Sequence, residues 1–253
     1  MRQQWMAAEE LGADALYTSD HFFAQDTSND ATAGEGSTFA VGMNFEAMTI
    51  QAAMAATTTR PQIGCLVHGV GFRNPHLTAD MARTIDHISN GRFILGLGTG
   101  YMKEDFVEYG YEWVRQKERS LNLAAKVPII KDRLSKLNPP PLRKLPILIG
   151  AMGSKIGMPL VAHHADIWHA YGTGEQLAVK IEELKELCMK IGRDFNEIEI
   201  ATWYTRGALH IDIKPDDIYA LGIRNIIQLQ IGPHWDLGIL RELLQWRDSL
   251  SQS

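Results

Sequence analysis

The sequence is short of the residues that would place it in a specialised class of protein. Its two cysteines, Cys65 and Cys188, have no metal-ligand spacing, so two reduced structural thiols and no metal site are expected. No stretch approaches the roughly 20 apolar residues of a membrane span, and nothing at the start reads as a signal peptide. Basic runs interleaved with aromatic residues are missing and the net charge is −5, which argues against a nucleic-acid partner. A reducing cytoplasm is therefore the default location, and no membrane partner is expected.

The chain has instead many short apolar runs that end in glycine or polar residues. These runs are apolar almost throughout rather than at alternate positions, which is typical of strands covered on both faces in a parallel sheet. They predict strands near residues 15–18, 63–67, 93–97, 147–149, 166–169, 198–202 and 226–230.

Two of the helices between these strands have clear boundaries. One is predicted to begin at Asn74, as N-cap, and to end at Asn90, and the other to begin at Thr173 and to end at Gly192. In the second helix, the Glu and Lys residues between the apolar positions form a solvated face. The expected apolar faces are Leu77, Met81, Ile85 and Ile88 in the first helix, and Leu177, Ile181, Leu184, Cys188 and Ile191 in the second.

The alternation of strands and helices predicts an α/β protein with a parallel sheet. The predicted strands are compatible with a doubly wound open sheet and with a (β/α)8 barrel that lacks one strand. No Pro/Gly-rich linker divides the chain, so residues 1–253 are expected to form one domain. In both architectures ligands bind at the carboxyl ends of the strands, and the residues just past those ends are the functional candidates.

Asp20 and His21 follow the first predicted strand and are the strongest catalytic candidates. Imidazole titrates near neutral pH, and a neighbouring carboxylate changes its proton affinity, which suits proton transfer. Adjacent residues at a strand end point in opposite directions, so one of the two is expected to face the ligand and the other to brace the loop. The alternative for His21 is a structural histidine bonded to a loop carbonyl.

Other strand ends suit binding. Residues 151–154 lead from a strand into a predicted helix, where exposed N–H groups, the positive helix end and a Ser hydroxyl favour an anion. Residues 98–100 lack the third glycine of the dinucleotide fingerprint and indicate close approach of backbone or of a flat ring. Aromatic residues that suit either the core or a planar substrate lie near the later strand ends: Trp168, His169, Tyr171, Trp203 and Tyr204.

Several motifs recur in a fixed order over most of residues 7–205. They are EELGADALYTSDHF, Phe72-Arg73-Asn74-Pro75, the helix end at residues 85–92, the strand end at residues 96–101, Glu104 with Tyr109-Gly110, PILIGAMGSK and HHADIW. In this order they resemble the luciferase-like oxidoreductase superfamily, whose fold is a TIM-type barrel. The likeness is closest to the branch that uses the deazaflavin coenzyme F-420, because SDHF stands where flavin-using relatives more often carry a Glu-His-His type of sequence.

The resemblance implies an oxidoreductase that transfers a hydride between the deazaflavin and a small organic substrate. Asp20 and His21 would be catalytic beside the reactive ring, with His21 the first choice for proton transfer, and a distorted, sometimes cis, peptide at residues 66–68 would back the ring. A homodimer is implied by the resemblance alone. The implied coenzyme contacts are Asp20, Val67, His68, Gly98, Thr99, Gly100 and Tyr101 near the ring, and Ala151, Gly153 and Ser154 near the phosphate.

Two alternative functions stay open. One is an FMN-dependent monooxygenase of the same superfamily, and the other is a non-catalytic flavin-binding barrel. Tyr101 stands where some sugar-phosphate-oxidising relatives place a glutamate, which argues against their substrate class.

Parts of the barrel of the relatives have no counterpart in the chain. The sequence opens inside the helix that follows their first strand, and the connections after Leu137 and at residues 214–221 are short. A barrel that lacks a strand has an open edge. The strand at residues 15–18 is therefore expected to lack a complete neighbour on its outer side, with a cost to activity.

Overall fold

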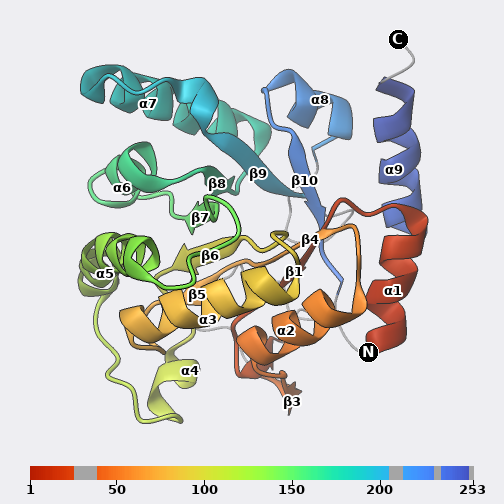
Figure 1. Ribbon diagram of the computed structural model, residues 1–253. Helices are drawn as coiled ribbons and strands as arrows, with labels where there is room; N and C mark the ends of the chain where they lie inside the picture. The colour runs from red at the N-terminus through yellow and green to blue at the C-terminus, as the bar shows by residue number, and fades with distance from the viewer. Residues whose placement is uncertain (26–38, 205–212, 231–234, 251–253) are drawn as a thin grey trace.

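The computed structural model describes residues 1–25, 39–204, 213–230 and 235–250, in which helices surround a layer of strands (Figure 1). No helix in these ranges is long and apolar enough to cross a membrane. The strands are β1 (Ala15–Thr18), β2 (Phe23–Gln25), β3 (Phe39–Met43), β4 (Gln62–Cys65), β5 (His68–Gly69), β6 (Leu95–Gly98), β7 (Ile147–Gly150), β8 (Ile167–Ala170), β9 (Glu199–Tyr204) and β10 (Asn225–Gln228). The helices are α1 (Arg2–Leu11), α2 (Ala47–Thr57), α3 (Pro75–Ile88), α4 (Lys103–Val107), α5 (Gln116–Lys136), α6 (Gly157–His164), α7 (Gly174–Ile191), α8 (Pro215–Ala220) and α9 (Gly238–Leu250), with a 3-10 turn η1 (Phe195–Glu197).

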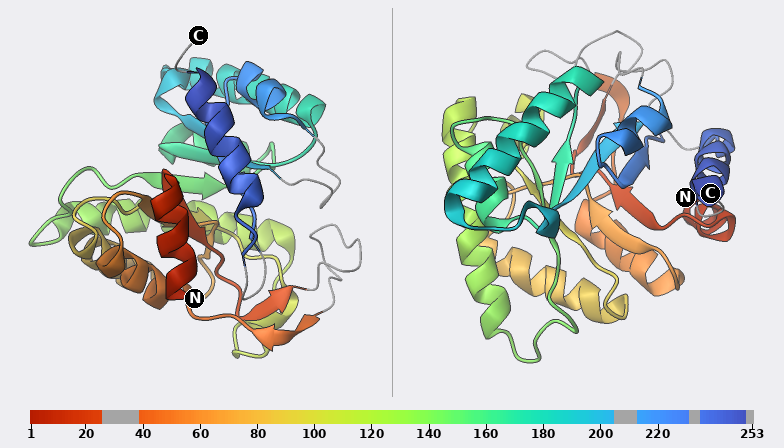
Figure 2. Two further views of the ribbon diagram at one scale, coloured as in Figure 1. Left: turned by 90° about the vertical axis from the view of Figure 1, so that its right-hand side faces the viewer. Right: turned by 90° about the horizontal axis from the view of Figure 1, so that it is seen from above.

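The strands follow one another around a barrel. Six of them are hydrogen-bonded in the parallel order β10-β9-β8-β7-β6-β5, and β1 pairs with β4, also in parallel. A bridge between Ile63 and Phe93 joins β4 to the chain just before β6, so β1 and β4 continue the same sheet. Seen from above, the helices ring the strands (Figure 2). The architecture is the TIM-type barrel that the resemblance implied, and not the open sheet that the strand pattern also allowed.

The predicted strands are confirmed to within two residues at each end. The sequence did not predict the antiparallel hairpin of β2 and β3. Its strands are three and five residues long and flank a polar segment, so the apolar pattern is too brief to show a period.

Two apolar layers stabilise the barrel. Since adjacent residues of a strand point to opposite faces, membership of a layer shows which way a side chain points. The outer layer lies between strands and helices and includes Leu97, Ile149 and Trp168. The inner layer fills the barrel and consists of Leu66, Ile94, Leu148, Ile167, Ala201 and Ile227.

β1 is an edge strand, as the sequence predicted. Within the described residues β1 pairs with β4 alone, and β10, at the other end of the sheet, pairs with β9 alone. A side-chain hydrogen bond links the two edges, because Asn225 Nδ2 donates to the Tyr17 hydroxyl at 3.1 Å. Burial raises the pKa of Tyr17 to about 12, so the hydroxyl stays protonated. Outside this seam α9 lies next to α1 (Figure 2), and Arg247 donates to the Asp14 carboxylate at 2.6 Å.

The helix ends are confirmed. The Asn74 side chain accepts hydrogen bonds from two backbone N–H groups of the first turn of α3. Thr173 and Gln176 form a capping box at the start of α7, and Gly192 ends that helix with a positive φ of 71°. Local sequence therefore determines where these helices begin and end.

The predicted apolar faces are only partly correct. Leu77 and Ile88 of α3 are 52% and 44% exposed, and Ile191 of α7 is 39% exposed. All three lie in the first or last turn of their helices, where the helix extends past the layer it packs on. In its middle α3 buries small residues, Ala79 and Ala82, against its neighbours. Small side chains at a contact carry no strong periodic signal, and the sequence therefore misjudged this face.

Gly98 shows how closely the strand ends pack. A Cβ added to Gly98 would lie 2.1 Å from Val67 Cγ2, far inside van der Waals contact. We expect Gly98→Ala to lower the free energy of unfolding by about 1–3 kcal/mol, because the β-branched Val67 side chain has little freedom to turn away. Urea unfolding measures the loss, and adding Val67→Ala should recover part of it.

Gly153→Ala is the matched control for this prediction. Nothing lies within 4 Å of a Cβ added to Gly153, so its free energy of unfolding should hardly change. Equal losses in the two single variants would show that the contact with Val67 is not the cause.

Candidate functional site

The carboxyl ends of the strands form the mouth of the barrel. Gly150, His169 and Ala201 are register partners in β7, β8 and β9, so their side-chain positions share one face of the sheet. Ala201 belongs to the inner layer, and His169 therefore points into the barrel. We call the space above this ring of residues, bounded by the segments that follow the strands, the barrel mouth.

His21 lies just past the end of β1 and is held by Asp105 of α4. Its Nδ1 is 2.6 Å from Asp105 Oδ2, and its ring meets the Tyr101 ring edge-on with the centroids 4.8 Å apart. The His21 side chain is 14% exposed and the Asp105 side chain 1% exposed. His21 Nε2 has no hydrogen-bond partner among the residues that the structure describes. The predicted proton-transfer residue thus presents an open nitrogen at the barrel mouth.

Asp20 points away from His21 and into the protein. Its two oxygens accept from the Arg73 guanidinium at 2.6 and 2.7 Å, and Oδ2 also accepts from Gly69 N at 3.0 Å. Burial alone would raise the pKa of the Asp20 carboxyl, but the neighbouring His68 and the Arg73 guanidinium outweigh it and hold that pKa well below its usual range. Asp20 is therefore an anion that joins β1 to β5, and its placement does not match the catalytic and coenzyme contacts expected from the sequence.

His68 lies outside the barrel interior, and the sequence-based placement of this residue at the mouth is wrong. The residue is 1% exposed, and its Nε2 lies 3.1 Å from Gln51 Oε1 of α2. Its Nδ1 is 3.7 Å from Asp20 Oδ2, beyond hydrogen-bond distance. Val67, its neighbour, packs against the inner layer, so alternation along the chain turns His68 toward the helices.

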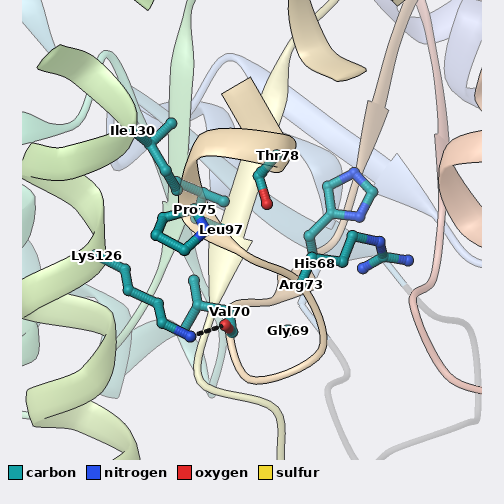
Figure 3. A pocket seen from close by; sticks show the side chains of 9 residues that line it. All are labelled: His68, Gly69, Val70, Arg73, Pro75, Thr78, Leu97, Lys126 and Ile130. Atoms are coloured by element: carbon teal, nitrogen blue, oxygen red, sulfur yellow. Dashed lines mark hydrogen bonds between the residues drawn. The ribbon is translucent and has the colours of Figure 1, made fainter. Parts of the chain in front are cut away.

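A small pocket lies behind the sheet next to His68 (Figure 3). Its volume of about 10 Å³ is room for about one water molecule. Lys126 of α5 closes one side and donates to the Val70 carbonyl at 2.7 Å, the dashed line in Figure 3. Thr78 and Pro75 of α3 also line the pocket. This pocket is too small for a coenzyme and is not part of the barrel mouth.

The side chain of Val67, and not the backbone of Gly98, faces the position where the sequence predicted the coenzyme ring. The peptide between Leu66 and Val67 is cis, as the resemblance implied for this segment. The Val67 side chain covers Gly98 and also lies 3.1 Å from a Cβ added to Gly150. A flat ring at the mouth would therefore rest on Val67 rather than on the buried backbone of Gly98.

The segment after β6 forms another wall of the mouth. Gly100 has a positive φ of 68°, and its carbonyl accepts from Arg119 Nε at 3.1 Å and from the Thr99 hydroxyl at 3.1 Å. Arg119 is 4% exposed and stacks on the Trp113 ring, so it braces this turn from below. Tyr101, next in the chain, is half-buried against His21.

The helix next to the predicted anion site, residues 151–154, begins later than expected. α6 begins at Gly157, after a turn, and not at Ser154. Gly153 and Ser154 are exposed. The Ser154 hydroxyl accepts from Lys180 Nζ of α7 at 2.7 Å and donates to Glu183 at 3.1 Å. The loop therefore offers a hydroxyl group, and α7 places an ammonium group and one carboxylate beside it.

The candidate aromatic residues separate into two groups. Trp168 and Tyr204 are buried in the outer layer, where Trp168 Nε1 donates to the Ala151 carbonyl at 2.8 Å. His169 instead meets the Trp203 ring edge-on at 5.0 Å inside the barrel, with Tyr171 6.3 Å away. Burial lowers the pKa of His169 to about 4, and its Nε2 has no partner in the described part of the chain. His169, Tyr171 and Trp203 form the aromatic wall of the mouth.

Sequence reasoning missed the residues that hold the two candidates in place. Asp105 is separated from His21 by 84 positions and Arg73 from Asp20 by 53. Arg73 belongs to one of the motifs quoted above, and Asp105 follows Glu104 of another. A charged residue in the segment after a strand was the one signal that could have identified each of them as a partner. Glu46 belongs with Asp20 and Arg73, because it caps α2 and accepts a hydrogen bond from Arg73 at 2.5 Å.

The mouth combines a polar atom, an aromatic ring and an apolar side chain. His21 Nε2 is an open polar atom beside a half-buried aromatic ring, and the Val67 side chain offers an apolar floor. A Cβ at Gly153 would meet open space, so the loop has room for a phosphate next to Lys180. The residues present therefore fit a planar ring with an anionic tail.

Comparison with known proteins gives a match to one family. Residues 1–220 match the family described as luciferase-like monooxygenase. The chain is 35% identical over 126 residues to an F-420-dependent glucose-6-phosphate dehydrogenase of Amycolatopsis mediterranei, covering 49% of this chain and 34% of that protein. It is 29% identical over 175 residues to pyrimidine monooxygenase RutA of Methylorubrum extorquens, covering 60% of this chain and 47% of the relative. The chain thus spans a third to a half of the length of these two curated relatives.

A solved structure shows the same fold. An F-420-dependent secondary alcohol dehydrogenase in complex with an F-420–acetone adduct matches with a TM-score of 0.67 and 20% identity. The match covers 81% of this chain and 64% of that one. At this identity the likeness establishes the barrel fold alone.

Proposed function

The chain belongs to the luciferase-like monooxygenase family, and on this premise we propose that it is an oxidoreductase that uses the deazaflavin coenzyme F-420. Its substrate would be a small organic molecule bound at the barrel mouth. The curated relatives described above include an F-420-dependent dehydrogenase and a monooxygenase, and the coarser assignment to a redox enzyme rests on both.

The observation that carries the proposal is His21 at the mouth. A buried carboxylate holds one ring nitrogen, the other nitrogen has no partner in the described structure, and Tyr101 fixes the ring from the side. The His21 side chain is 14% exposed, so the open nitrogen can be reached from the mouth. Proton transfer by such a group accelerates a reaction by about 10²–10⁴-fold.

The chemistry divides between the coenzyme and the chain. When bound, the coenzyme supplies the acceptor or donor of a hydride. In alcohol oxidation His21 Nε2 would accept the hydroxyl proton as the substrate carbon gives up a hydride, which would leave a carbonyl product. Carbonyl reduction is the reverse, with the proton returned from His21. His169, Tyr171 and Trp203 would position the substrate from the aromatic wall.

The chain would hold the coenzyme at two places. Val67 and Tyr101 would contact the ring, and the loop at Ser154 with Lys180 would receive the phosphate. Glu183 has to turn away from Ser154 for this, because a carboxylate next to a phosphate is repelled. This movement is confined to one partly exposed side chain.

The second candidate function is an FMN-dependent monooxygenase. The alignment with the pyrimidine monooxygenase, which is the longer of the two described above, favours it. A flavin ring would use the same floor and the same histidine. The two functions are separated by the cofactor that binds.

Absorbance titration of the purified chain with each cofactor, under anaerobic conditions, tests the proposal. Coenzyme F-420 is expected to bind in the micromolar range, with a standard binding free energy of about −8 kcal/mol, and FMN about tenfold more weakly. Repeating the titration in phosphate buffer tests the site proposed for the coenzyme phosphate. Inorganic phosphate that occupies this site should weaken coenzyme binding.

Two outcomes contradict the proposal. Tight FMN binding, followed by oxygen consumption once the flavin is reduced, would assign the chain to the monooxygenases. Protein that is folded by circular dichroism and binds neither cofactor would indicate a non-catalytic barrel.

A further inference from the structure

Asp105 is held more firmly than its neighbour His21. Oδ1 accepts from the backbone N–H groups of Phe22 and Phe23, at 2.9 and 3.3 Å, and Oδ2 faces His21 Nδ1 at 2.6 Å. The residue is 0% exposed and lies in the first turn of α4. The carboxylate thus connects the helix after β6 to the chain after β1.

We propose that Asp105 is a positioning residue that keeps the His21 proton on Nδ1 and leaves Nε2 as a proton acceptor at the barrel mouth. An ionised carboxylate only accepts hydrogen bonds, so the short contact requires a proton on Nδ1. A neutral imidazole carries one N–H, and its other nitrogen is then bare. The assignment concerns the chain alone, and its use in catalysis rests on the proposed function.

The two backbone N–H groups determine which Asp105 oxygen faces His21. They require an acceptor at Oδ1, which fixes the orientation of the Asp105 side chain about its last bond. In Asp105→Asn the amide oxygen would have to stay at that place, since an NH₂ group there would face two donors. The amide NH₂ would then point at His21 Nδ1, which must become an acceptor. The variant is therefore expected to invert the tautomer and put the proton on Nε2.

A second aspartate–histidine pair, Asp20 and His68, lies behind the strand ends and lacks these features. His68 Nδ1 is 3.7 Å from Asp20, and Arg73 occupies both oxygens of that carboxylate. The His68 side chain is 2% exposed, against 14% for His21. Of these two pairs, the pair of His21 and Asp105 combines a short contact with a ring that reaches the mouth.

Nitrogen NMR of the histidine side chains, on protein without coenzyme, tests the proposal. His21→Ala assigns the His21 signals among the nine histidines. At roughly pH 9, above the ordinary imidazole pKa, the wild-type His21 should show a protonated Nδ1 and a bare Nε2. Asp105→Asn should exchange the two signals. If a substrate is found, the same variant should lower its turnover by about 10²–10⁴-fold without a matching change in coenzyme affinity.

Asp86→Asn is the matched control. Asp86 is also 0% exposed and accepts a backbone N–H, from Leu142 at 2.8 Å, but it lies away from the mouth. It should leave the His21 signals unchanged. A wild-type His21 protonated on Nε2, or an Asp105→Asn variant that keeps the wild-type pattern, overturns the proposal. The wild-type result does not depend on the folding of Asp105→Asn, because the assignment uses His21→Ala, and it stays informative if the cofactor titration fails.

Discussion

His21→Ala is expected to lower turnover by about 10²–10⁴-fold and to leave coenzyme affinity nearly unchanged. The side chain presents one open nitrogen to the mouth. The variant leaves the Val67 side chain and the loop at Ser154, which would hold the coenzyme, intact. The loss should therefore fall on kcat and not on the dissociation constant of the coenzyme. Stopped-flow absorbance of the coenzyme, with the substrate that the wild type turns over fastest, measures the effect.

His76→Ala serves as the control for this loss. His76 is exposed at the start of α3, and the described contact of its backbone is with the Asn74 cap. Its turnover should equal that of the wild type. If His21→Ala keeps wild-type turnover, His21 is a structural histidine and the proton-transfer role is wrong.

Arg73→Met is expected to lower the free energy of unfolding by about 3–5 kcal/mol. The variant removes the guanidinium from both oxygens of Asp20 and leaves a carboxylate that is 4% exposed without its main counter-charge. Urea unfolding at neutral pH measures the change. Adding Asp20→Asn should return part of the stability, because the uncompensated charge is then gone.

The same pair makes a pH-dependent contribution whose sign follows from the pKa of Asp20. The folded protein holds that pKa well below the unfolded value of about 3.9, so the stabilisation is fully present above pH 4. It is lost as the pH falls from there through the folded pKa. Asp20→Asn should therefore show a smaller decline in the free energy of unfolding below about pH 4 than the wild type. Parallel curves for the two proteins would mean that Asp20 is not held as an anion by Arg73.

Local sequence was sufficient for the strands and helices of this barrel, whereas the choice of a barrel over an open sheet rested on the resemblance to a known family. Each strand is a short apolar run, and the caps at Asn74 and Thr173 depend on residues within one helical turn. The position of the mouth followed from strand direction alone. The unpaired edge of β1 was also predictable, because it depends on which strands exist and not on how they pack.

The site depended on contacts that the sequence does not display. His21 and Asp20 are neighbours, yet one is held by α4 and the other by the segment before α3. Which of two adjacent polar residues reaches a ligand is decided by alternation and by the partner each one finds. His68 was misplaced for the same reason, since its burial against Gln51 depends on α2. The start of α6 at Gly157 was missed because a turn, not a cap, precedes it.

A crystal structure of the chain with coenzyme F-420 tests the central claim most directly. The account predicts that the deazaflavin ring lies on Val67 within hydrogen-bond reach of His21 Nε2, and that the phosphate contacts Ser154 or Lys180. A ring bound away from His21, or a mouth that side chains fill when the coenzyme is present at saturation, would contradict it.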